Sequence, residues 1–124
     1  MLNNQDATAT IAVKDLRAAK AFYEGKLGLK PADSMEDQAV SYSAGSSRLL
    51  VYVSQFAGTN QATAATWAVE DVEREVEALK GRGIAFEHYQ MPEATLKGDV
   101  HISGGRKAAW FKDPDGNIHA VVSR

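Results

Sequence analysis

The sequence predicts an α+β fold in which one strand–helix–three-strand unit occurs twice. Val13-Lys14-Asp15-Leu16 matches Val69-Glu70-Asp71-Val72 at an offset of 56 residues, which indicates an internal repeat. In each copy a short β-favouring stretch precedes apolar residues at helical spacing, and clusters of β-forming residues follow. These three observations predict one domain spanning 1–124, with module 1 at about 1–57 and module 2 at about 63–124.

Each module is predicted to start with a strand, at 9–13 and at 65–69, that leads into a helix. Asp15 and Asp71 follow these strands, and a short carboxylate there can accept hydrogen bonds from the unpaired N–H groups of a helix start. Apolar residues then recur at helical spacing until glycines, which tolerate the positive φ of a helix C-cap. The helices should therefore end near residues 26 and 82.

Three strands are predicted to follow each helix, because β-forming residues cluster between Asp, Gly and Ser turn residues. They span 30–35, 38–43 and 48–54 in module 1, and 84–89, 108–112 and 117–123 in module 2. Asp113-Pro114-Asp115-Gly116 favours a tight turn between the last two strands. The segment 91–105 is predicted as a long loop, and loops of that length often carry function.

Composition argues against several classes of function. Lys and Arg total 14 against 16 for Asp and Glu, so neither a nucleic acid nor an anionic membrane surface is indicated as a partner. The chain has no cysteine, which excludes disulfides, zinc–thiolate sites and cysteine nucleophiles. The longest strongly apolar run, Leu49 to Val53, is far too short to cross a bilayer, and no N-terminal leader pattern is visible. A cytoplasmic protein is expected.

Five sequence segments, spread over nearly the whole chain, are informative together. They are Ile11-Ala12-Val13-Lys14-Asp15-Leu16, Ala21-Phe22-Tyr23-Glu24, Leu27-Gly28-Leu29, Val69-Glu70-Asp71-Val72 and Ala109-Trp110-Phe111-Lys112-Asp113-Pro114-Asp115-Gly116-Asn117. In these segments the chain resembles the vicinal oxygen chelate superfamily, which includes glyoxalase I, extradiol dioxygenases and bleomycin-resistance proteins. The resemblance implies two βαβββ modules whose eight strands form a curved cup with the helices on its outer face. It also implies a small-molecule ligand inside the cup and a homodimer.

The resemblance further implies four strand positions at which metal-dependent members of the superfamily carry His or an acidic residue. Counting from the helix caps and from the last turn gives these positions, which are Thr8, Ala65, Val51 (or Tyr52 if the register shifts by one) and Ala120. A divalent ion needs several converging oxygen or nitrogen donors. Since these four positions offer no imidazole and no carboxylate, no metal and no other cofactor is predicted.

Aromatic and polar side chains on and near the predicted strands are candidate ligand contacts, because they would bind a flat or apolar molecule by burial, stacking and hydrogen bonding. The candidates are Thr8, Thr10, Tyr42, Tyr52, Trp67, His101 and Trp110. Trp67 shares strand parity with Ala65 and is therefore expected to face the cup. His101 is also a candidate for a catalytic role, since imidazole titrates near neutral pH.

These observations lead to two functional hypotheses from different classes. The favoured one is a metal-free protein that holds an apolar or aromatic small molecule in the cup. The alternative is a metal-dependent glyoxalase- or dioxygenase-like enzyme whose ligands have moved to His101, His88 or His119 and nearby carboxylates. Strand alternation is expected to turn His119 away from the cup, because it lies next to the Ala120 position. A metal-free isomerase or lyase with a single general base is a third possibility.

Overall fold

The computed structural model describes residues 1–35 and 37–124, whose strands form two sheets that do not close into a barrel. The first sheet contains β1 (Ala9–Val13), β2 (Lys30–Met35), β3 (Ala39–Ala44) and β4 (Ser47–Val53), in the order β1-β4-β3-β2. The second contains β5 (Thr63–Val69), β6 (Phe86–Glu87), β7 (Thr95–Lys97), β8 (Val100–Ser103), β9 (Arg106–Lys112) and β10 (Ile118–Ser123). Its order is β5-β10-β9-β8-β7, with β6 also paired to β9. The predicted α+β fold is confirmed.

Aspartates start both main helices, as predicted. The Asp15 carboxylate accepts a hydrogen bond from the Arg17 amide at 2.9 Å, and Asp71 accepts one from the Arg74 amide at 3.1 Å. α1 (Leu16–Lys20) continues into a π-helical segment, η2 (Ala21–Lys26), and α2 spans Val72–Gly81. A single 3₁₀ turn, η1 (Leu2–Asn4), lies near the N-terminus. Among the described residues, no helix is both long and apolar enough to cross a membrane.

The segment 91–105 differs from the predicted loop because it contains a β-hairpin. β7 and β8 pair antiparallel, with Leu96 opposite His101 and a two-residue turn at Gly98 and Asp99. Gly98 has a φ of 62°, the conformation that such a turn requires. These strands are too short to show a period-2 pattern in the sequence. The hairpin extends the second sheet and places His101 on a strand instead of in a loop.

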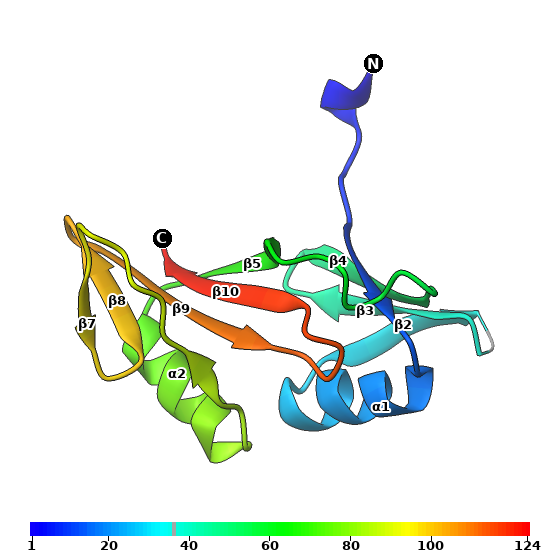
Figure 1. Cartoon of the computed structure of the whole chain (residues 1–124). Coiled ribbons are helices and arrows are strands. Elements are labelled where there is room, and N and C mark those ends of the chain that lie inside the picture. Colours follow the sequence, from blue (N-terminus) through cyan, green and yellow to red (C-terminus); the bar gives the residue numbers. More distant parts are fainter. Residues whose placement is uncertain (36) are drawn as a thin grey trace.

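Both sheets are covered by helices on one side only (Figure 1). We call this side the helix face and the opposite side the open face. The helix face forms the core, which includes Ile11, Val13, Val40, Tyr42, Leu49 and Val51 of the first sheet and Ala109, Phe111 and Val121 of the second. The N-terminal segment rises on the open side of β1, and the two sheets meet along β1 and β5 (Figure 1). A helix packed under each sheet leaves both open faces turned to the same side.

A buried hydrogen-bond chain joins the two modules on the helix face. The Tyr23 hydroxyl donates to Asp113 Oδ2 at 2.7 Å and lies 2.9 Å from Nε2 of His119. The Trp67 indole N–H donates to Nδ1 of His119 at 3.1 Å. Since Nδ1 accepts, the ring proton must sit on Nε2, which therefore donates to the Tyr23 oxygen. His119 is fully buried, and Phe111 stacks on its ring at a centroid distance of 4.9 Å.

The predicted turn at 113–116 is present and is locked onto the first module. Asp113 Oδ1 accepts hydrogen bonds from the Asp115 and Asn117 amides at 3.0 and 2.8 Å. The Asn117 side-chain amide donates to Asp113 Oδ2 and to the Ala12 carbonyl oxygen of β1, both at 2.8 Å. The connector between the modules packs against the same turn, since a Cβ added at Gly58 would lie 2.8 Å from the Asp115 carbonyl oxygen. The turn therefore holds β1 of the first module and the connector between the modules against the second module.

The His119 imidazole makes folding sensitive to acid. Burial lowers the pKa of His119 to about 4, against an ordinary value of 6.5. Between these two pH values the unfolded chain binds a proton that the folded protein does not, so the unfolding free energy must fall as the pH falls. The loss of unfolding free energy is complete below the pKa of His119 in the folded protein, and it is absent above the ordinary histidine pKa of the unfolded chain. It amounts to about 3 kcal/mol.

We expect His119→Gln to lose this part of the pH dependence, because glutamine does not titrate. Urea unfolding between pH 7 and pH 4 measures it as the slope of the unfolding free energy against pH. His88→Gln is the matched control, since it removes a histidine whose side chain is 49% exposed. The control should keep the slope of the unsubstituted protein. Equal slopes for His119→Gln and the unsubstituted protein would contradict the assignment.

Candidate functional site

A cavity of about 600 Å³ lies on the open face of the second sheet. Its floor comes from neighbouring strands, because the pairings His101–Ala108 and Ala108–Val122 place these residues side by side on one face. The residues that line it are Met91, Ala94, His101, Ser103, Gly105, Arg106, Lys107, Ala108, Trp110, Val122, Ser123 and Arg124. Apolar and aromatic groups thus share this cavity with cationic side chains.

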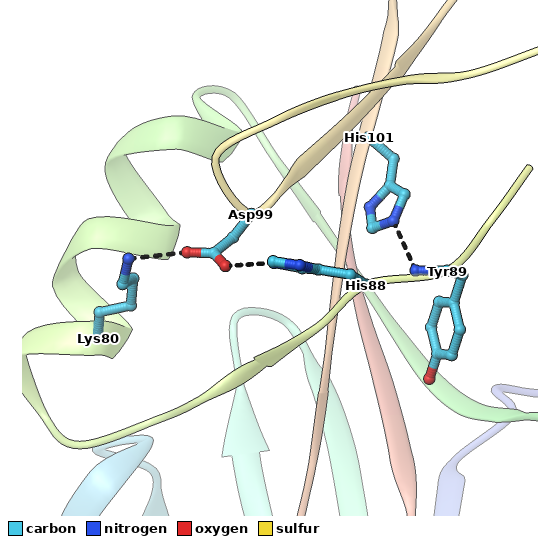
Figure 2. Close-up of polar contacts among 5 residues, drawn as sticks. All are labelled: Lys80, His88, Tyr89, Asp99 and His101. Carbon is cyan, nitrogen blue, oxygen red and sulfur yellow. Dashed lines mark hydrogen bonds and ion pairs between the residues drawn. The ribbon is translucent and has the colours of Figure 1, made fainter.

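His101 is held in one orientation by the backbone. It is only 3% exposed, and its Nε2 accepts a hydrogen bond from the Tyr89 amide at 3.0 Å (Figure 2). An amide N–H can only donate, so Nε2 is unprotonated and the ring proton sits on Nδ1. Nδ1 is buried and has no hydrogen-bond partner among the described residues. The His101 ring therefore lines the cavity, while its unpaired N–H donor is itself enclosed by protein atoms.

Three rings pack together at this end of the cavity. His101 and Trp110 meet edge to face with centroids 4.9 Å apart, and Tyr89 meets Trp110 in the same way at 5.4 Å. Tyr89 also stacks over His101 at 6.2 Å. Such contacts are favourable beyond the area they bury. They fix the Trp110 indole as a rigid part of the lining.

Beside this cluster, an ion-pair chain ties the β7–β8 hairpin to α2. Asp99 Oδ2 lies 2.8 Å from Lys80 Nζ, and Asp99 Oδ1 lies 2.7 Å from His88 Nε2 (Figure 2). Hydrogen bonds from Lys80 and then His88 lower the pKa of Asp99. His88 is committed to Asp99, and its ring centroid is 6.4 Å from that of His101. The two histidines and Asp99 therefore form no converging donor set.

The residues at the implied metal positions do not fit a metal ion. Val51 and Ala65 belong to the core on the helix face, so their placement in the cup is wrong. The alternative Tyr52 lies on the open face. It follows the core residue Val51 and pairs with Ala12, and strand side chains alternate between the two faces. The repeat offset carries Thr8 to Ala64, one residue before the predicted Ala65. Neither imidazole nor carboxylate stands at any of these positions.

Relocated ligands are not assembled either. Both ring nitrogens of His119 are hydrogen-bonded on the helix face, as strand alternation predicts. Among residues 1–35 and 37–124, no three His, Asp or Glu side chains come close enough together to hold a metal ion. The donor set required by the alternative metal-dependent hypothesis is thus not found in the described part of the chain.

Two of the predicted ligand contacts point into the protein core. The prediction that Trp67 faces the cup is wrong, because its reference residue Ala65 itself lies on the helix face, where Trp67 bonds to His119. Tyr42 is fully buried, and its hydroxyl donates to Glu24 at 2.8 Å. Burial and this bond raise the pKa of Tyr42. Neither ring lies on the open face.

The remaining candidates are divided between the two sheets. His101 and Trp110 lie together in the cavity, whereas Thr8, Thr10 and Tyr52 belong to the first module and do not line it. The Thr10 hydroxyl instead donates to the Thr8 carbonyl oxygen at 3.1 Å. The candidates from the sequence do not include four further residues around the cavity, namely Tyr89, Met91, Arg106 and Arg124. Alternation along the strand that starts near Arg106 could have grouped Arg106 with Trp110.

Comparison with known proteins agrees with this architecture. The family model described as the Glyoxalase/Bleomycin resistance protein/Dioxygenase superfamily matches residues 6–120, and the chain belongs to this superfamily. Among curated proteins, no sequence match is found.

Solved structures of this superfamily share the fold. A glyoxalase family protein from Enterococcus faecalis superposes with a TM-score of 0.73 at 22% identity, covering 98% of this chain and 99% of its own. A lactoylglutathione lyase from Agrobacterium tumefaciens gives 0.70 at 22% identity, with coverages of 95% and 92%. The fosfomycin resistance protein FosX from Mesorhizobium loti gives 0.67 at 12% identity, with coverages of 100% and 94%. At these identities the likeness shows the fold alone.

The hydrogen bonds of the two buried histidines predict opposite tautomers. His101 should carry its proton on Nδ1 and His119 on Nε2, since their other nitrogens accept bonds from the Tyr89 amide and the Trp67 indole. Long-range ¹H–¹⁵N correlation spectra near neutral pH distinguish the two forms by the ¹⁵N shifts. Exposed His88 serves as an internal reference. An Nε2–H tautomer at His101 would contradict the geometry described above.

Proposed function

We propose that this protein binds a small organic molecule, without a metal ion, in the cavity on the open face of its second sheet. The observation that carries the proposal is the cavity of about 600 Å³ that combines the Trp110 ring with the imidazole of His101. Small-molecule sites are typically concave, largely apolar and furnished with a few fixed polar groups. The lining meets each of these criteria.

The chemistry of the lining supports binding without a metal. Met91, Ala108, Trp110 and Val122 can bury apolar ligand surface. Among the described residues that line the cavity, His101 carries the only imidazole, and no side chain is a carboxylate. Two structural neighbours, the lactoylglutathione lyase and the fosfomycin resistance protein, have names that refer to small molecules. These names support a small-molecule ligand as a class.

The experiment is titration calorimetry of chelator-treated protein against a panel of flat organic compounds, with metal content measured in parallel. We expect binding by metal-free protein, and we expect Trp110→Ala to weaken it about tenfold or more because a ring that buries ligand surface is lost. Phe56→Ala is the control, since it removes an exposed aromatic ring that does not line the cavity. A stoichiometric transition metal that is lost in His101→Ala would favour the metal-dependent alternative and contradict this proposal.

We also propose that two copies pair through their open faces as a homodimer. Three large side chains near the open faces are exposed to solvent, with exposed fractions of 37% for Tyr52, 37% for Tyr89 and 44% for Leu96. All six residues of the edge strand β2 are exposed as well. Exposed strands and apolar patches of this kind are typically covered by a partner. A second copy would also close the cavity from above.

Light scattering coupled to size exclusion tests the dimer. We expect a mass of twice the 13.4 kDa chain, and we expect Tyr52→Asp to shift the population toward monomer by burying a charge in the interface. Arg74→Gln on α2 is the control, since it also changes the net charge by −1 but does so on the helix side. A clean monomer for the unsubstituted protein would overturn the proposed dimer.

A further inference from the structure

We infer that the cavity selects a flat organic anion, with the ring against Trp110 and the negative charge beside Arg106. This inference rests on the proposed function, because it names the class of ligand for the same site. It is carried by the signs of the charges around the cavity, by the hydrogen-bonding character of its polar groups and by the shape of its floor.

The charged residues that line the cavity are all basic: Arg106, Lys107 and Arg124. The Lys107 side chain turns toward α2, where its ammonium group pairs with Glu73 at 2.7 Å, so its charge lies on the helix side. Arg124 lies 3.8 Å from Glu70, a side chain that is 88% exposed. Exposed pairs of this kind are weak. Arg106 has no ion-pair partner within the part of the chain that the structure describes. A positive potential therefore extends over the cavity, with Arg106 as its free cation.

The polar groups of the lining mainly donate hydrogen bonds. Arg106 presents guanidinium N–H groups only, and these groups are exposed beside the cavity. The Ser123 hydroxyl oxygen is already used as an acceptor by the Lys107 amide at 3.0 Å. A ligand rich in acceptor oxygens satisfies such groups, whereas an ammonium group finds few acceptors and meets like charges. A carboxylate satisfies both the charge and the donors.

The floor of the cavity suits a planar ring. Trp110 is fixed by Tyr89 and His101, and the floor residues Ala108 and Val122 beside it carry small side chains. Small neighbours beside a rigid indole leave its exposed surface accessible to a flat molecule. Met91, which lies between β6 and β7, adds a polarizable side chain to the lining. The ring of the ligand would therefore lie against Trp110, and its negative charge would lie beside Arg106.

The test compares three probes with one ring system and different charges: 2-naphthoate, neutral 2-naphthamide and cationic 2-naphthylmethylammonium. Calorimetry gives the affinities, and the ¹⁵N-labelled indole N–H resonance of Trp110 reports binding in the cavity. We expect 2-naphthoate to bind at least tenfold tighter than the amide and the ammonium compound to bind weakest. Added NaCl should reduce the advantage of 2-naphthoate over the amide.

Arg106→Gln provides the residue-level test. It should reduce the affinity for 2-naphthoate about tenfold and leave the affinity for 2-naphthamide unchanged, because only the anion uses the guanidinium group. Arg74→Gln is the matched control, since it removes the same charge from α2 on the helix side and should change neither affinity. A similar loss in both variants would indicate a nonspecific charge effect and would overturn the assignment of Arg106.

The outcomes separate the ligand class from the function itself. Equal affinities for the three probes, with the Trp110 resonance shifted by each, would overturn the anion inference and leave small-molecule binding intact. Preference for the ammonium compound would do the same. If no probe shifts the Trp110 resonance at millimolar concentration, both the anion inference and the proposed binding site are overturned.

Discussion

The hydrogen-bond chain through Trp67, His119, Tyr23 and Asp113 is the interaction on which the rest of the structure depends. Its members come from both modules, and each polar atom of its imidazole has a partner. Buried polar groups that lose a partner are costly, so the strands that carry them cannot slide by one residue without breaking several bonds. This fixes which side of β10 faces the helices. It thereby fixes which side of the second sheet is left open for the cavity.

Two buried histidines illustrate how the same side chain is used differently on the two faces. His119 is saturated by an indole and a phenol, so it has no donor or acceptor left for a ligand. His101 is bonded on one nitrogen only, by a backbone amide, and keeps an unused donor. The difference arises from neighbours that are distant in sequence. It makes His119 a structural residue and His101 the better candidate for ligand contact.

Much of the fold could be predicted because its signals are local. The helix caps Asp15 and Asp71, the turn at 113–116 and the strands other than β7 and β8 follow from side-chain chemistry within a few residues. The site was predicted less well, because strand residues alternate between faces and a one-residue error reverses the assignment. Counting from Asp71 gives Ala65 as a cup residue, and the orientation expected for Trp67 contains the same error, because it is based on Ala65. The sequence predicts a loop at His101 because β7 and β8 are too short to recognise.

The sequence alone determined the repeated strand–helix pattern, the caps and the absence of His or acidic residues at the implied metal positions, because these are properties of residue type and spacing. Tertiary structure alone decided which rings face the core, which nitrogen of each histidine is free and which cations surround the cavity. Those features depend on pairing between strands far apart in the chain. Contacts of that kind have no signature within a single segment, since each partner is defined only when the sheet has formed.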